Sequence, residues 1–156
     1  MDSAVHSVPS IRRRVASMVY DGLLLMGVLS VGLVVPHVMI GYLAGFAVSG
    51  IWLWLHTFAL IGAYFVWFWH HGGQTLAMQT WKIKVQGIDT VSPSLATLAL
   101  RYALAWPSVL LLGVGIWWAV VDRDRQFLHD RLAGTRIFLL NDVPPTTTVT
   151  HPPTKR

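Results

Sequence analysis

Two long apolar stretches with almost no charge constrain the fold of this chain more than any other feature of its sequence. Residues 15–35 are apolar apart from Ser17, Asp21 and Ser30, and residues 51–69 are apolar and rich in aromatic side chains. A helix of about 20 apolar residues is long enough to cross a hydrocarbon core of about 30 Å. Both stretches are therefore predicted to be membrane-spanning helices.

The composition supports a membrane protein. Hydrophobic residues make up 54% of the 156 residues and charged residues only 12%, whereas a soluble domain carries about 25% charged residues. The net charge is +5 and the basic residues flank the apolar stretches. We therefore expect contact with anionic lipid headgroups and no binding of nucleic acid. Cysteine is absent, which excludes disulfides, thiolate nucleophiles and cysteine metal sites.

A third apolar stretch, residues 95–121, has an ambiguous length. Its 27 residues would extend about 40 Å as a helix, too long for one untilted crossing and too short for two. It is expected to form either one tilted helix or a broken hairpin that bends near Pro107. The predicted fold class is an all-α membrane protein with three to four transmembrane or half-transmembrane helices.

Shorter segments complete the expected organisation of the chain. Residues 1–10 are predicted to be a flexible N-terminus, residues 11–140 the membrane domain, and residues 141–156 a disordered Pro/Thr-rich tail. Residues 72–94 are more polar, and we expect them to form a short amphipathic segment at the cytoplasmic membrane surface. Within them, apolar and polar side chains alternate over residues 81–86, as in a strand. Residues 136–140 suggest another short strand.

The distribution of basic residues predicts the orientation in the membrane. Arg12, Arg13 and Arg14 precede the first apolar stretch, which places the N-terminus in the cytoplasm and residues 70–84 on the same side after two crossings. A single crossing by residues 95–121 would put a basic tail outside, against the same rule. We therefore favour a cytoplasmic tail over an external one. The length of the first apolar run and the Asp21 within it argue against a cleaved signal peptide.

Four sequence elements resemble those of one bacterial family. They are the segment RRVASMVYD at residues 13–21, the segment GGQTLAMQTWKIKV at residues 72–85, Arg101, and the segment HDRLAGT at residues 129–135. Together they resemble the RDD family, which is named for an arginine and two aspartates. The sequence lacks the basic residue that this family more often carries at position 79. The resemblance implies a multi-pass protein of the bacterial inner membrane, with transport or ion exchange suspected for some members.

Arg13, Arg14 and Asp21 form the first candidate site. Arg14 and Asp21 lie two helical turns apart, so they share one face with Cα atoms about 10 Å apart. An ionised carboxylate at that depth costs a few kcal/mol unless it is paired. We expect Asp21 to form a salt bridge with Arg101, although Arg101 could instead bind a lipid phosphate. Such a bridge could lock helix packing, or Asp21 could bind a proton or cation.

The remaining candidates are histidines and the second acidic element. Asp130 is expected to accept backbone hydrogen bonds or to pair with an arginine such as Arg14 or Arg136, so that the adjacent His129 and Asp130 act as a structural lock. His56, in the middle of the second span, is either a proton relay or a neutral packing residue. No metal site and no cofactor are expected.

Two hypotheses for function follow. The first is a transport-related protein that exchanges a monovalent cation or a proton through Asp21, and because 156 residues form a thin pathway, it would act as a homo-oligomer. The second is a non-catalytic membrane scaffold or assembly factor whose arginines and aspartates lock helix packing. An enzyme is not expected, because no nucleophile–base pair or metal-ligand set is present.

Overall fold

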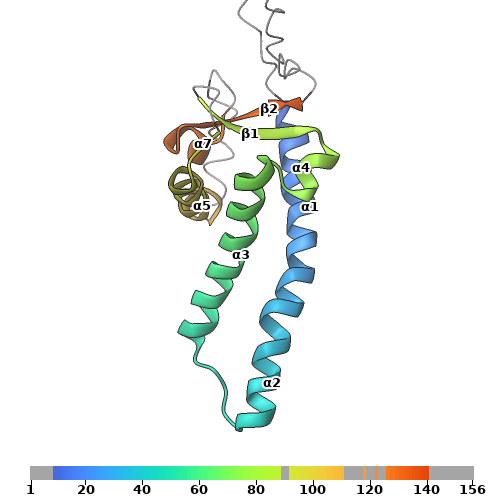
Figure 1. The fold of residues 1–156 in the computed structure, drawn as a ribbon, viewed down its shortest axis with the longest axis vertical. Helices are drawn as coiled ribbons and strands as arrows, with labels where there is room; N and C mark the ends of the chain where they lie inside the picture. Colours follow the sequence, from blue (N-terminus) through green and yellow to red (C-terminus); the bar gives the residue numbers. More distant parts are fainter. Residues whose placement is uncertain (1–8, 89–91, 111–117, 119–121, 123–125, 141–156) are drawn as a thin grey trace, which may run out of the picture.

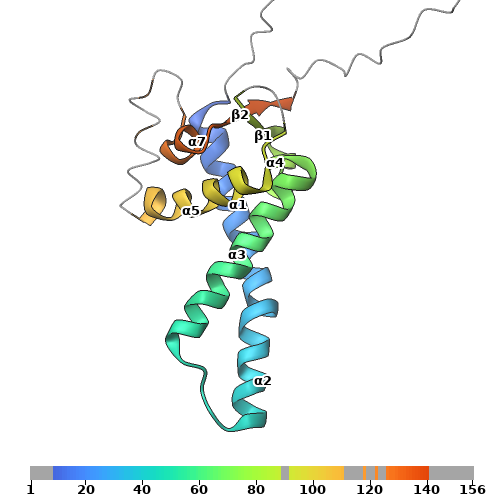
Figure 2. The ribbon, with the colours of Figure 1, turned by 60° about the vertical axis from the view of Figure 1, so that its left-hand side comes forward.

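Two long helices form a hairpin, and every other described element gathers at one end of it (Figures 1 and 2). The computed structural model describes residues 9–88, 92–110, 118, 122 and 126–140. The gathered elements, here called the cap, are α4 (Leu76–Thr80), β1 (Ile83–Gly87), α5 (Leu95–Leu110), α7 (Leu128–Leu132) and β2 (Thr135–Leu139). They lie where the first long helix begins and the second ends. The cap therefore surrounds the head of the first helix, which carries Arg14 and Asp21.

The first long helix runs without a break through α1 (Ile11–Leu29), the π-helix η1 (Ser30–Val34) and α2 (Val35–Ala44). The side chain of Ser10 caps its start by accepting a hydrogen bond from the backbone N–H of Arg13. A proline inside a helix commonly ends or bends it, but this helix continues past Pro36. Pro36 lies directly after the π-helical turn, and such a wide turn accommodates the missing N–H and the bulk of a proline. The helix ends at Gly45, whose φ is +71°.

The second long helix, α3 (Gly50–Gly72), returns to the cap. In the described part of the chain, α3 and the continuous helix Ile11–Ala44 are the two helices long and apolar enough to cross a membrane. Many of their large side chains are exposed, including Met26, Val31, Trp52 and Trp54. Exposed apolar faces of this kind suit lipid or another helix. The expected count of three to four spans is not confirmed.

Helix α5 (Leu95–Leu110) lies across the long axis of the hairpin: Figure 1 shows it end-on and Figure 2 from the side. The choice between a tilted helix and a broken hairpin for residues 95–121 depends on positions that mostly lie outside the described residues.

The cap contains a two-stranded sheet, so the predicted all-α class requires correction. Strand β1 (Ile83–Gly87) pairs antiparallel with β2 (Thr135–Leu139). Ile83 and Val85 are each 1% exposed and pack in a core with side chains of α3, α5 and β2. The alternation over residues 81–86 thus indicates a strand that is buried on one face. This strand forms because β1 pairs with β2, which lies about 50 residues later in the chain.

The pairing of β1 with β2 also determines the side of the described part of the tail. Helix α7 (Leu128–Leu132) and β2 lie in the cap, beside the start of α1. Residues 126–140 are therefore at the same end of the hairpin as Arg14. This is the arrangement that a tail on the same side of a membrane as the N-terminus requires.

Gly62 provides the close approach between α3 and α5. A Cβ atom at this position would lie 2.8 Å from Cε1 of Tyr102, and the Tyr102 hydroxyl donates a hydrogen bond to the carbonyl oxygen of Phe58.

We expect Gly62→Val to lower the free energy of unfolding by about 1–3 kcal/mol through overpacking. Thermal unfolding in detergent would measure this. Gly27→Ala, where a Cβ meets nothing within 4 Å, should be neutral or stabilising, and a similar loss in both variants would contradict the packing argument.

Candidate functional site

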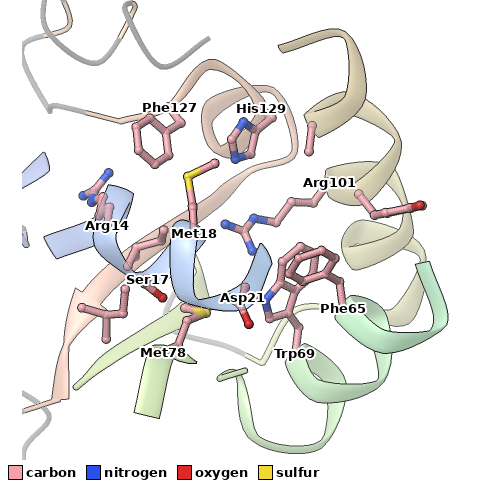
Figure 3. Close-up of a pocket in the computed structure, with 14 residues that line it drawn as sticks. Arg14, Ser17, Met18, Asp21, Phe65, Trp69, Met78, Arg101, Phe127 and His129 are labelled. Carbon is pink, nitrogen blue, oxygen red and sulfur yellow. The ribbon is translucent and has the colours of Figure 1, made fainter. Parts of the chain in front are cut away.

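One face of α1 carries the polar residues that point into the cap. Arg14, Ser17 and Asp21 are 2%, 2% and 5% exposed, and their spacing places them on one helical face. Figure 3 shows all three along α1, facing side chains of α3, α5 and α7. The predicted shared face of Arg14 and Asp21 is confirmed. Arg13 is exposed and points away from this site.

Asp21 is held by hydroxyl groups. The Tyr64 hydroxyl donates to Oδ1 at 3.0 Å and the Thr75 hydroxyl donates to Oδ2 at 2.8 Å. Thr75 also caps the start of α4 (Leu76–Thr80) by accepting from the backbone N–H of Met78. Within the described ranges, no cationic side chain lies within ion-pair distance of Asp21. The expected salt bridge between Asp21 and Arg101 is therefore wrong.

Arg101 instead forms a buried ion pair with Asp130. Its Nε and Nη2 atoms lie 2.8 Å and 2.6 Å from Oδ1 of Asp130, and the two residues are 3% and 1% exposed. The Arg101 guanidinium also stacks over the Trp69 ring, 4.2 Å from its centre. Asp130 thus pairs with an arginine, as predicted, and that arginine is Arg101, because α5 crosses the hairpin directly beside α7. The Arg14 guanidinium lies over the Phe127 ring, 5.5 Å from its centre.

His129 takes part in the same cluster as a neutral side chain. Its Nδ1 lies 3.1 Å from the Ser108 hydroxyl, and its Nε2 lies 3.5 Å from Oδ1 of Asp130. Burial is the main cause that lowers the pKa of His129 to about 4, with Arg101 and Arg14 adding to the effect and Asp130 opposing it. Near neutral pH, Nδ1 can accept from Ser108 while Nε2–H faces Asp130. This arrangement supports the predicted structural lock.

The lowered pKa of His129 predicts how stability depends on pH. A histidine titrates near 6.5 in the unfolded chain, so between pH 6.5 and about 4 the unfolded state binds the extra proton. The stabilising contribution is complete above pH 6.5 and is lost as pH falls to 4, a total of about 3 kcal/mol. Thermal unfolding from pH 7 to 4.5 would show the decline. His129→Gln should remove much of its slope between pH 6.5 and 5.5, and an unchanged slope would contradict this assignment.

A cavity of about 110 Å³ lies at the centre of these groups. Its polar lining comes from Arg14, Ser17, Asp21, Arg101 and His129 (Figure 3). The remaining walls are mostly apolar side chains: Met18, Phe65, Trp69, Met78, Ile83, Tyr102, Ala105, Phe127 and Ile137. Four of the five polar residues are ones predicted from the sequence as site residues.

His56 lies apart from this site. Its ring faces that of His37, with the centres 5.2 Å apart, and His56 is eight residues before Tyr64, or about 12 Å along α3. No hydrogen bond joins His56 to the Asp21 site among the described residues. The described contacts therefore do not link His56, the predicted proton relay, to Asp21.

Sequence reasoning missed Tyr64, Thr75, Trp69 and Ser108, which contact the predicted site residues directly. Thr75 could have been found from the sequence, because threonine is a preferred residue at the start of a helix. Tyr64 and Trp69 could not, because aromatic residues near the end of a spanning helix are also typical of the membrane interface. In the described ranges, no group of three or more His, Asp or Glu side chains is arranged to hold a metal ion.

Comparisons with known proteins agree with the resemblance. The RDD family model matches residues 8–134. A protein of Rickettsia prowazekii (strain Madrid E), named "Uncharacterized protein RP437", is 34% identical over 77 residues, which cover 49% of this chain and 42% of that protein. The match thus spans less than half of the length of this relative. No solved structure matches.

Proposed function

This chain belongs to the RDD family of membrane proteins, and we propose that it exchanges protons or monovalent cations across the membrane through Asp21. The observation that supports this is a buried carboxylate in a helix long enough to span, held by two hydroxyls, with no cationic partner among the described residues. Intramembrane carboxylates commonly mark proton and ion pathways.

The separation of the two carboxylates supports a division of roles. Asp130 is neutralised by Arg101 and belongs to the lock between α5 and α7. Asp21 keeps an uncompensated site for a proton or a cation. The hydroxyls of Ser17, Tyr64 and Thr75 lie around it or on the same helix face, and hydroxyl and carboxylate oxygens are suitable ligands for hard cations.

We place the protein in the bacterial inner membrane as a homo-oligomer, with the N-terminus and the cap in the cytoplasm. Exposed apolar residues cover both long helices, and two spanning helices do not enclose a pathway alone. Arg12 and Arg13, exposed at the start of α1, are positioned to contact anionic lipid headgroups.

A flux assay tests the role of Asp21. Purified protein in proteoliposomes should exchange protons for Na⁺, K⁺ or Li⁺ under a pH gradient, and Asp21→Asn should reduce the flux at least tenfold while the protein remains folded. Tyr64→Phe, which removes one hydroxyl from Asp21, should shift the cation concentration that gives half-maximal flux. Tyr20→Phe is the matched control, since Tyr20 is 43% exposed. Equal flux by Asp21→Asn and the wild type would overturn the proposal.

A second candidate is a membrane scaffold or assembly factor. The buried ion pair between Arg101 and Asp130, which ties α5 to α7, favours it. This function predicts that purified protein shows no flux for any cation, that partner proteins co-purify with it, and that Asp21→Asn changes stability alone.

A further inference from the structure

The outward face of α5 is apolar, and its strongly polar side chains point inward. The exposed side chains between residues 95 and 108 are all apolar: Leu95, Ala96, Ala99, Leu100, Ala103 and Pro107. Arg101 and Ser108, by contrast, are 3% and 6% exposed and contact Asp130 and His129. A helix at the surface of a water-soluble domain shows the opposite arrangement. Water is therefore an unsuitable neighbour for the outward face of α5.

The contacts of α5 with α3 show at which level of the hairpin α5 lies. The centre of the Trp106 ring lies 6.4 Å from that of Trp54 and 5.4 Å from that of Phe58. The Tyr102 ring centre lies 5.0 Å from that of Phe58, and the Arg101 guanidinium lies over the Trp69 ring. The partners of α5 therefore extend through most of α3, from Trp54 to Trp69.

The length of α3 indicates where a membrane boundary crosses it. A hydrocarbon core of about 30 Å takes about 20 residues of helix, so a crossing that begins at Gly50 ends near His70. The contacts of α5 from Trp54 to Trp69 fall on the membrane side of this boundary. The junction with the sheet, where the N–H of Val85 donates to the carbonyl oxygen of Gly73, falls beyond it. Figure 1 shows the same order, with α5 on the hairpin side of β1 and β2.

We infer that α5 lies within the cytoplasmic leaflet of the membrane, with its outward face against lipid acyl chains. The exposed surface of α3 continues onto this face, because Trp54 is 55% exposed and its ring contacts Trp106. The sheet stays on the aqueous side, so α5 is the part of the cap that enters the membrane. This inference rests on the proposed placement of the hairpin in the membrane, and not on ion exchange.

The placement gives α5 two different faces. Its inner face supplies Arg101, Tyr102 and Ala105 to the wall of the cavity that Asp21 also lines. Its outward face meets hydrocarbon, so α5 separates the Asp21 site from the acyl chains. The buried ion pair between Arg101 and Asp130 fits this position, since charged side chains at membrane depth face the protein interior and pair with one another.

Fluorescence quenching of the full chain in nanodiscs tests this placement. Because the chain has no cysteine, a single cysteine at Ala99 or Ala103 can carry a bimane probe. A nitroxide on the lipid acyl chains should quench each probe by about half, as for a group in the hydrocarbon core, whereas iodide in the water should quench it little. Val31→Cys, at a position 72% exposed on the first long helix, is the lipid-facing reference. Gln79→Cys, at an exposed position of α4, is the water-facing reference.

The two references separate this inference from the proposed placement of the hairpin. Lipid quenching at Val31 together with iodide quenching at Ala99 and Ala103 would overturn the inference and keep the hairpin in the membrane. Iodide quenching at every position would overturn the placement of the hairpin itself. Protection of Ala99 and Ala103 from both quenchers would show that protein, such as a second copy of the chain, covers this face, and would also overturn the inference.

Ala103→Asp provides a test that needs no label. A carboxylate among acyl chains is costly, so the amount of monodisperse full chain extracted from membranes should fall about threefold or more relative to the wild type. Ala103→Asn is the matched control, because it adds a side chain of the same size without a charge and should lose less. Equal recovery of Ala103→Asp and the wild type would contradict a lipid-facing α5.

Discussion

Replacing Arg101 by methionine is expected to lower the free energy of unfolding by about 3–5 kcal/mol. The substitution removes the partner of Asp130, which is 1% exposed and receives two hydrogen-bond contacts from that arginine. A buried carboxylate without a counter-ion is strongly destabilising. Thermal unfolding in detergent and the fraction of monodisperse protein on size exclusion would measure the loss.

Two further variants show whether the ion pair causes this loss. Arg13→Met removes an exposed arginine of α1 and should change the free energy of unfolding by less than about 0.5 kcal/mol. Arg101→Met combined with Asp130→Asn leaves no buried charge and should recover part of the stability. If the double variant is as unstable as the sum of the single variants, the loss comes from packing and not from the unpaired carboxylate.

Replacing Gly73 by alanine is expected to cost about 2–4 kcal/mol. Gly73 has φ of +71°, and a Cβ atom there would lie 2.9 Å from the carbonyl oxygen of Val85 and 2.7 Å from Cε of Lys84. The left-handed conformation costs about 1–2 kcal/mol for a residue with a side chain, and the contact with backbone adds about 1–2 kcal/mol more. Because the carbonyl of Gly73 accepts from the N–H of Val85, the join between α3 and β1 should loosen.

Gly134 is the matched control for this substitution. Its φ is +64°, but a Cβ atom there would meet nothing within 4 Å. Gly134→Ala should therefore cost only the conformational part, about 1–2 kcal/mol. Thermal unfolding of the two variants under identical conditions compares them, and equal losses would show that the contact of position 73 with β1 contributes nothing.

Helical features were predictable because they depend on neighbours along the chain. The runs of apolar residues in α1 and α3 determine their length, and the two-turn spacing of Arg14 and Asp21 determines that they share a face. The extent of the first helix beyond Pro36 was not predictable, because a π-helical turn leaves no clear signal in composition. The alternation over residues 81–86 indicated a strand, but the sequence of this segment does not show that its partner is β2.

Asp21 and Arg101 illustrate what required the tertiary structure. The sequence by itself determined that a carboxylate lies within a spanning helix, that arginines and a second acidic element must accompany it, and that the chain resembles the RDD family. It could not determine which arginine forms an ion pair with which aspartate. The crossing of α5 over the hairpin brings Arg101 to Asp130, 29 residues away, and leaves Asp21 to the hydroxyls of Tyr64 and Thr75. Helical periodicity is a local property, whereas the partner of a buried charge depends on how distant elements pack.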